Sequence, residues 1–339
     1  MRARSGPMMR MLNAERRNWR RLLTPRVVVI SVAIGSAVAA ADARAQTVST
    51  GNTAVQQVQI FNQRNATAAE AEQRLAPPPD PLTGDDAAAD SDLGEQWLFK
   101  PNQPLTPWSA HADLSGFYTS NAALASTTEQ SDRFLVADFG VGYSRPLGRD
   151  FGFAASLQQA FFRYDEFTAL DFDSLGANLG VSYQARQFGD IVFSAQYGFS
   201  RLTRATFEDE LFLGNTLGLT ATKLVRLTTA DTIEFSGGVG YTFADPGELQ
   251  RVEFRASVGY AIRITRALTA TAIARTELFD YQHGRQDFLQ SIALGARYDF
   301  TKWISASVAA SLANNSSNRN VFDYRVFNGG LTASAHVQF

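Results

Sequence analysis

The sequence of 339 residues contains no cysteine and only three histidines, at positions 111, 283 and 336. The absence of cysteine excludes disulfide bonds, thiolate nucleophiles and cysteine-ligated metal sites. Neither a phosphate-binding glycine loop nor a metal-ligand spacing occurs in the sequence. We therefore predict no catalytic residues, no metal site and no cofactor.

The sequence also lacks an apolar run that is long enough to cross a bilayer as a helix. The run at residues 27–41 is shorter than the roughly 20 residues that a membrane helix needs. It follows an arginine-rich region and precedes the small residues "ARA" at 43–45, a pattern typical of a cleaved export signal. We predict that residues 1–45 are a signal peptide.

Positive charge is scarce once this signal is removed. Residues 1–45 hold nine of the 31 basic residues and two of the 33 acidic residues, so the mature chain has a formal net charge of −9. A surface with this charge argues against nucleic acid as a partner.

Residues 46–107 have the composition of a tether. Prolines and acids dominate residues 77–92, and only residues 57–76 have a pattern that permits one short helix. We predict a mostly disordered periplasmic linker. In an alternative interpretation, the short helix binds a periplasmic protein or plugs the domain that follows.

A repeat begins after Trp108. The fragments "GVGY", "GVSY", "GLTA", "SVGY", "GARY" and "HVQF" end at residues 143, 183, 221, 260, 298 and 339, which are 38 to 41 residues apart. Each unit contains two segments in which apolar and polar residues alternate, as in a strand with two different faces. Six hairpins of this kind predict twelve strands over residues 108–339.

The connections between these strands alternate in length as well. Short turns are expected near residues 145–150, 185–190, 226–231, 263–267 and 300–302, and mostly longer loops lie between them. One face of the strands carries an uninterrupted apolar band, and the other carries arginines and glutamates that a sandwich core would not tolerate unpaired. The sequence therefore predicts an all-β fold, a transmembrane antiparallel up-and-down β-barrel.

The carboxyl terminus strengthens this interpretation. The chain ends on "HVQF", so that Val337 and Phe339 lie on the apolar face of the last strand. In this the sequence resembles bacterial outer-membrane β-barrels, porins among them, whose last strand typically ends in an aromatic residue. The resemblance covers residues 108–339, although Ser334 stands where the signal often has glycine. It implies that Phe339 and Val337 form an insertion signal for the barrel assembly machinery in an outer membrane whose lipids surround the barrel.

The face opposite the apolar band predicts the lining of the lumen. Hairpin folding near Thr265 puts Arg255 opposite about Thr276 and therefore close to Arg275 and Glu277. Clustered arginines would attract anionic solutes; alternatively, arginines and acids simply pair and fill the lumen. The candidate ligand-binding residues are Arg251, Arg255, Arg275, Arg297, Glu253 and Glu277.

Three functions are compatible with these features. A polar lumen without a long lid loop favours a narrow channel for small, in particular anionic, solutes. A structural or export component of an envelope complex, for example in exopolysaccharide secretion, would use residues 46–107 to bind a periplasmic partner. An enzyme is disfavoured, because the strands place His111 and His336 near one end of the barrel and His283 in a loop at the other.

Overall fold

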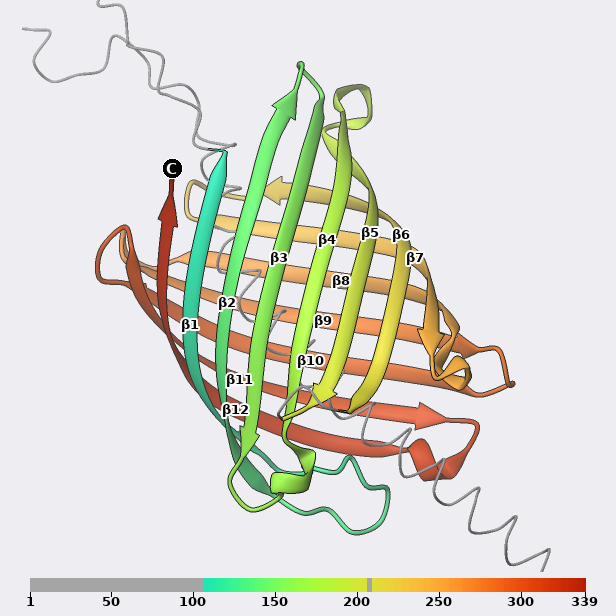
Figure 1. Ribbon diagram of the computed structural model, residues 1–339. Coiled ribbons are helices and arrows are strands. Elements are labelled where there is room, and N and C mark those ends of the chain that lie inside the picture. The colour runs from blue at the N-terminus through green and yellow to red at the C-terminus, as the bar shows by residue number, and fades with distance from the viewer. Residues whose placement is uncertain (1–106, 206–208) are drawn as a thin grey trace, which may run out of the picture. The chain divides into compact units, whose positions relative to one another are not determined.

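The computed structural model of the protein describes residues 107–205 and 209–339. These residues form twelve antiparallel strands, in which each strand pairs with its neighbours in sequence and β12 pairs with β1 (Figure 1). The predicted fold, a closed β-barrel of twelve strands, is confirmed. The strands are β1 (Trp108–Thr119), β2 (Asp132–Leu147), β3 (Phe151–Tyr164), β4 (Phe172–Ala185), β5 (Ile191–Arg204), β6 (Glu210–Arg226), β7 (Asp231–Asp245), β8 (Arg251–Arg263), β9 (Leu268–Tyr281), β10 (Gln286–Asp299), β11 (Ile304–Ser317) and β12 (Tyr324–Gln338).

Helical structure is sparse in the described part of the chain. It consists of the single-turn 3-10 helices η4 (Thr168–Leu170), η5 (Arg186–Phe188), η6 (Gly247–Leu249) and η7 (Asn320–Phe322). None of the described helices has the length and apolar character needed to cross a membrane. The predicted signal peptide and nearly all of the predicted linker lie outside the described residues, so both stay predictions.

The alternating sequence pattern determines which face of each strand lines the lumen. On β2, Phe134, Val136 and Asp138 are buried, whereas Leu135 and Phe139 between and after them are more than half exposed. Because cross-strand partners share a face, the same alternation continues around the barrel. The inward and outward faces therefore match those expected from the sequence.

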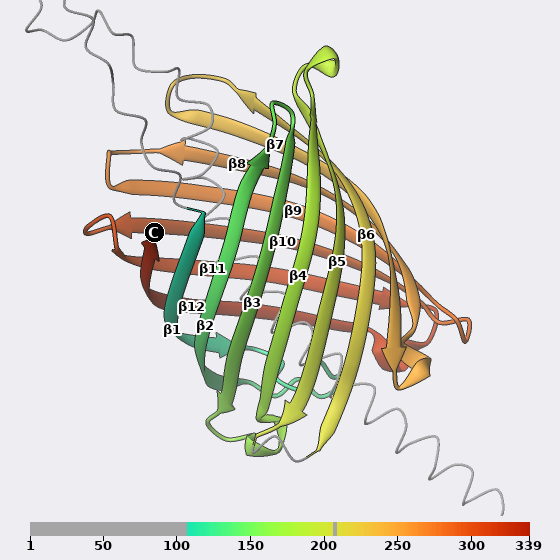
Figure 2. The same cartoon turned by 45° about the horizontal axis from the view of Figure 1, so that its top comes forward.

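The two ends of the barrel differ. The end that carries Trp108 and Phe339, here called the terminal end, has the turns 148–150, 186–190, 227–230, 264–267 and 300–303. The opposite end, here called the loop end, has the connections 120–131, 165–171, 205–209, 246–250, 282–285 and 318–323. At the terminal end the backbones of Trp108 and Phe339 exchange two hydrogen bonds of 3.1 and 3.0 Å, which completes the seam between β1 and β12 (Figure 2).

The outward face is an apolar belt that ends in aromatic residues. Leu331 in the middle of β12 is 66% exposed. Exposure of this much apolar surface is unfavourable in water and favourable in contact with lipid chains. At the terminal end, Trp108 packs edge-to-face on Tyr143, and Tyr298 packs in the same way on Phe300. These rings lie where membrane-spanning barrels carry an interfacial girdle of aromatic residues.

The inward face is not polar along its whole length. Near the loop end, apolar side chains from β2 to β6 and from β9 to β12 form one buried cluster. The long β1–β2 connection folds Ala122 and Leu124 into this cluster, although the sequence suggested no lid loop. The lumen is thus narrowed by apolar side chains at its loop end. Besides Leu124 and several alanines, the buried members of this apolar cluster are Phe134, Val136, Phe162, Tyr164, Phe172, Leu202, Phe212, Leu249, Phe279, Tyr281, Leu289, Tyr324 and Val326.

Candidate functional site: a charged ladder in the lumen

A group of charged side chains in the lumen begins on β8. Arg251, Glu253 and Arg255 are alternate residues of β8, so their side chains share one face of the strand and all three point inward. Glu253 accepts hydrogen bonds from Arg251 Nε at 2.9 Å, from Arg255 Nη2 at 2.6 Å and from the Thr242 hydroxyl of β7 at 3.0 Å. One carboxylate therefore holds two arginines in fixed positions.

Strand β9 adds an arginine–glutamate pair, Arg275 and Glu277, next to the three charged residues of β8. These five residues are called the charged ladder here. Glu277 is the direct cross-strand partner of Arg255, and Arg275 is the partner of Ser257. The predicted register was wrong by one residue, because β8 and β9 turn at residues 264–267 and pair Arg263 with Thr269. Arg275 Nη2 donates to Glu277 Oε1, so this arginine also has a carboxylate partner on its own strand.

The ladder continues into the β9–β10 connection, where the sequence did not point to a site residue. Arg285 Nε lies 3.2 Å from Asp287 Oδ2, and its guanidinium stacks on Tyr281 and Phe322 at 3.6 and 4.1 Å from the ring centres. Arg251 lies over Phe279 in a similar way, at 4.9 Å. The spacing of arginine two residues before an acid, repeated at 251, 275, 285 and 297, is the signal that could have identified Arg285.

Arg297 stands apart from the other candidate residues. On β10, Ser291 is the residue that pairs with Arg275, and Arg297 lies six positions further toward the terminal end. Its Nε donates to Asp299 Oδ1 at 2.7 Å. The structure thus brings together Arg251, Glu253, Arg255, Arg275 and Glu277 and leaves Arg297 outside this group.

Access to the ladder arginines is unequal. The side chain of Arg255 is 31% exposed and that of Arg275 is 19% exposed, against 10% for Arg251. The buried Nε of Arg255 has no hydrogen-bond partner among the described residues. Since a guanidinium offers five donors, Arg255 and Arg275 keep capacity for an additional anion after they bind their own carboxylates.

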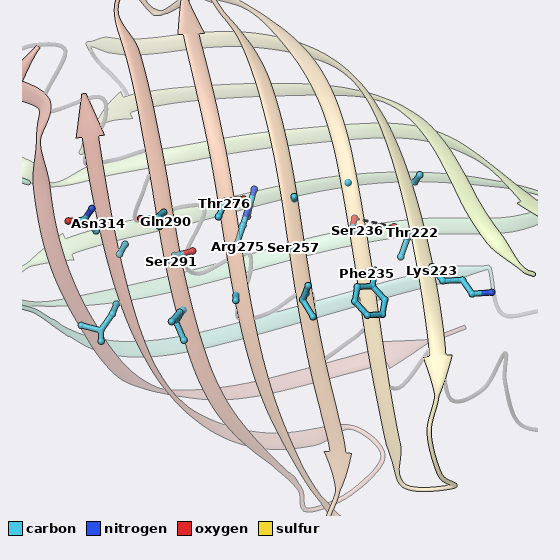
Figure 3. Close-up of a pocket in the computed structure, with 18 of the residues that line it drawn as sticks. Thr222, Lys223, Phe235, Ser236, Ser257, Arg275, Thr276, Gln290, Ser291 and Asn314 are labelled. Carbon is cyan, nitrogen blue, oxygen red and sulfur yellow. Dashed lines mark hydrogen bonds between the residues drawn. The ribbon is translucent and has the colours of Figure 1, made fainter. Parts of the chain in front are cut away.

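One groove on the described part of the barrel lies mostly on the outward face and touches the ladder only at Arg275. It has a volume of about 880 Å³ and crosses β5 to β12 (Figure 3). Most of its lining side chains have the parity of the outward face, among them the exposed Phe235, Val258 and Ile292. The groove is therefore a shallow part of the apolar belt, and it is not a solute site of the lumen.

The residues of the predicted insertion signal lie on the outward face at the terminal end. Val337 is paired with Ala110 of β1, and Phe339 lies beyond the last residue of β12. Both side chains are exposed, Phe339 by 61%. Their position agrees with the alternation in the sequence.

Comparison with known proteins supports the fold. No family model matches the sequence, and no curated protein matches it. Among solved structures, the chain is similar to an outer-membrane channel from Pseudomonas putida F1, with 10% sequence identity, a TM-score of 0.50, and coverage of 72% of this chain and 100% of that one.

Two further solved structures are similar to this protein. One is the β domain of the Bordetella autotransporter BrkA, with 12% identity, a TM-score of 0.41 and coverage of 67% and 98%. The other is a bacterial polysaccharide outer membrane secretin, with 10% identity, a TM-score of 0.43 and coverage of 68% and 98%. The protein has the fold of bacterial outer-membrane β-barrels, and its outward face has the apolar belt that a membrane-spanning barrel requires.

Proposed function

We propose that the barrel is a narrow channel for small solutes and that it favours anionic ones, such as acidic sugars. The observation that carries this proposal is the placement of Arg255 and Arg275 on neighbouring strands, paired to carboxylates and still partly exposed to the lumen. Guanidinium groups bind carboxylates in bidentate geometry and stay charged at physiological pH.

The number of strands is compatible with a restricted pore. Barrels of about eight strands are filled by their own side chains, and barrels of roughly sixteen enclose a water channel. Twelve strands fall between these cases. A pore of this size would select solutes by size and charge through the groups that line it.

The proposal includes an orientation in the membrane. Bacterial barrels turn their short connections toward the periplasm, so the terminal end would face the periplasm and residues 46–107 would lie there. In this orientation Val337 and Phe339 would be available to the assembly machinery on the periplasmic side.

Charge selectivity tests the role of the arginines. In a planar bilayer with a salt gradient, the reversal potential of the double variant Arg255→Gln and Arg275→Gln should shift toward cation preference, because two fixed positive charges are removed from the pore. Arg133→Gln is the matched control, since Arg133 is an exposed residue on the outward side of β2. Equal reversal potentials for the double variant and the wild type would contradict anion selection by these residues.

A second function is favoured by the apolar cluster that narrows the loop end. A barrel that does not conduct could serve as a structural or export component of an envelope complex, for example in exopolysaccharide secretion, and use residues 46–107 to bind a periplasmic protein. Conductance of the mature chain with and without residues 46–107 separates the two functions. A channel conducts in both forms, whereas an export component remains silent and loses its cellular function when the segment is deleted.

A further inference from the structure

Two buried carboxylates face each other across β1 and β2. Asp113 and Asp138 are direct cross-strand partners on the inward face, and their side chains are 7% and 1% exposed. Among the described residues, neither has an arginine or lysine within 4.0 Å, whereas the ladder carboxylates Glu253, Glu277 and Asp287 all do. Like charges in this position are destabilising unless a cation lies between them.

His111 completes this arrangement. Its Nε2 atom lies 2.9 Å from Asp138 Oδ1 and 4.0 Å from Asp113 Oδ2, and one donor atom from each of the three residues lies within 4.8 Å of the others. A neutral imidazole supplies no charge, and a protonated one supplies a single positive charge for two carboxylates. The cluster therefore has the donor atoms of a metal site and an unbalanced negative charge.

Neighbouring residues hold these three donors in place. Gln158 Nε2 donates to the second oxygen of Asp138 at 2.6 Å, and Ser334 of β12 is the cross-strand partner of Asp113. The imidazole lies over Gly140, where an added Cβ would be only 2.2 Å from its Cε1 atom. Such outer partners, which fix the orientation of ligands, are typical of metal sites.

We propose that His111, Asp113 and Asp138 bind one divalent transition-metal ion, for which Zn²⁺ is the representative probe. One imidazole nitrogen and two carboxylate oxygens suit zinc and its first-row neighbours, while magnesium and calcium prefer oxygen ligands alone. The ion replaces the proton that lies between Nε2 and Asp138, and this proton is released to solvent. His336 is the cross-strand partner of His111 on β12, but it is not one of the residues whose donor atoms lie within 4.8 Å of one another.

This proposal is independent of channel function. The ion would join β1 to β2 directly beside the β1–β12 seam and would neutralise two negative charges of the lumen wall. Arg297 is the arginine whose charge acts on Asp113, and it is bonded to Asp299 on its own strand. No described arginine therefore occupies the position between the two carboxylates.

Zinc binding to the tag-free mature chain tests the site. We expect isothermal titration calorimetry with ZnCl₂ to find one ion per chain, and His111→Gln and Asp138→Asn to weaken binding by at least about tenfold, the lower limit seen even when outer partners are changed. His283→Gln is the matched control, because His283 lies in the β9–β10 connection. Absence of stoichiometric zinc binding by the wild type, or equal loss in the His283 variant, would overturn the proposal.

A second variant keeps all three ligands. Gly140→Ala should displace the imidazole and lower zinc affinity, whereas Gly180→Ala, whose Cβ would meet nothing closer than 3.7 Å, should leave it unchanged. Circular dichroism and heat-modifiable gel mobility show whether each variant is folded. A folded Gly140→Ala protein with wild-type zinc affinity would exclude His111 as a ligand in the observed position.

Discussion

Glu253 is the residue on which the charged ladder depends most. It binds two arginines and one hydroxyl while almost fully buried. The sequence alone predicted that the ladder residues face the lumen, because parity determines the face. The sequence could not show that each arginine is already paired with a carboxylate. An arginine and an acid two positions apart on one strand make contact only if the rotamers of both side chains turn toward each other.

We predict that Glu253→Gln increases the preference of the pore for anions and lowers the stability of the barrel. Loss of the negative charge leaves Arg251 and Arg255 without their partner, so the reversal potential should shift toward anions. Removal of one member of a buried ion pair typically costs about 3–5 kcal/mol, so the midpoint of urea unfolding should fall. Asp280→Asn, an exposed change on β9, should alter neither quantity.

At the level of elements, the β1–β2 connection is the part of the barrel that the sequence predicted least well. Its residues are small and polar, and this composition looks like that of an exposed loop. Ala122 and Leu124 are nevertheless buried in the lumen cluster. The reason is a long-range contact. Asn121 donates hydrogen bonds to the carbonyl oxygens of Ala125 and Arg325, and the bond to Arg325 cannot be predicted from the local sequence because Arg325 lies on β12.

The anchoring of this connection leads to a second prediction. Asn121→Ala removes the hydrogen bond from Asn121 Nδ2 to the Arg325 carbonyl oxygen of β12 and the bond from the Ala125 N–H to Asn121 Oδ1 within the connection. The loop end should therefore widen and single-channel conductance should rise. Asn318→Ala is the comparable change in the β11–β12 connection, where Asn318 bonds to Gly284 outside the cluster. If both variants conduct like the wild type, the connection does not restrict the pore.

For the molecule as a whole, the alternating pattern was sufficient to predict strand number, order and orientation of the faces. A repeat of two strands brings each hairpin beside the next, and the apolar belt fixes which face meets lipid. The lumen was harder to predict, because inward residues on distant strands meet only after closure. The hydroxyl groups of Ser115 on β1 and Thr332 on β12, which lie 2.8 Å apart, are one example. The buried cluster that contains both Phe134 of β2 and Leu289 of β10 is another.

Assembly of the whole barrel should depend on its last residue. Deletion of Phe339 is expected to lower the amount of barrel in the outer membrane, because it removes an exposed aromatic residue and both backbone hydrogen bonds with Trp108. Refolding in detergent should be nearly unaffected, since the twelve strands remain. Phe300→Ser, a change of another exposed aromatic residue at the same end, is the control; equal losses would indicate a general effect of the girdle.

The pairing of β1 with β12 also sets an order of events in time. The two strands come from opposite ends of the described sequence, so their meeting closes the longest loop in the molecule and carries the highest entropy cost of any pairing. Until that contact forms, both strands present unpaired edges to their surroundings. The barrel therefore cannot close before β12 has been synthesised and exported, and until then the sheet keeps two open edges.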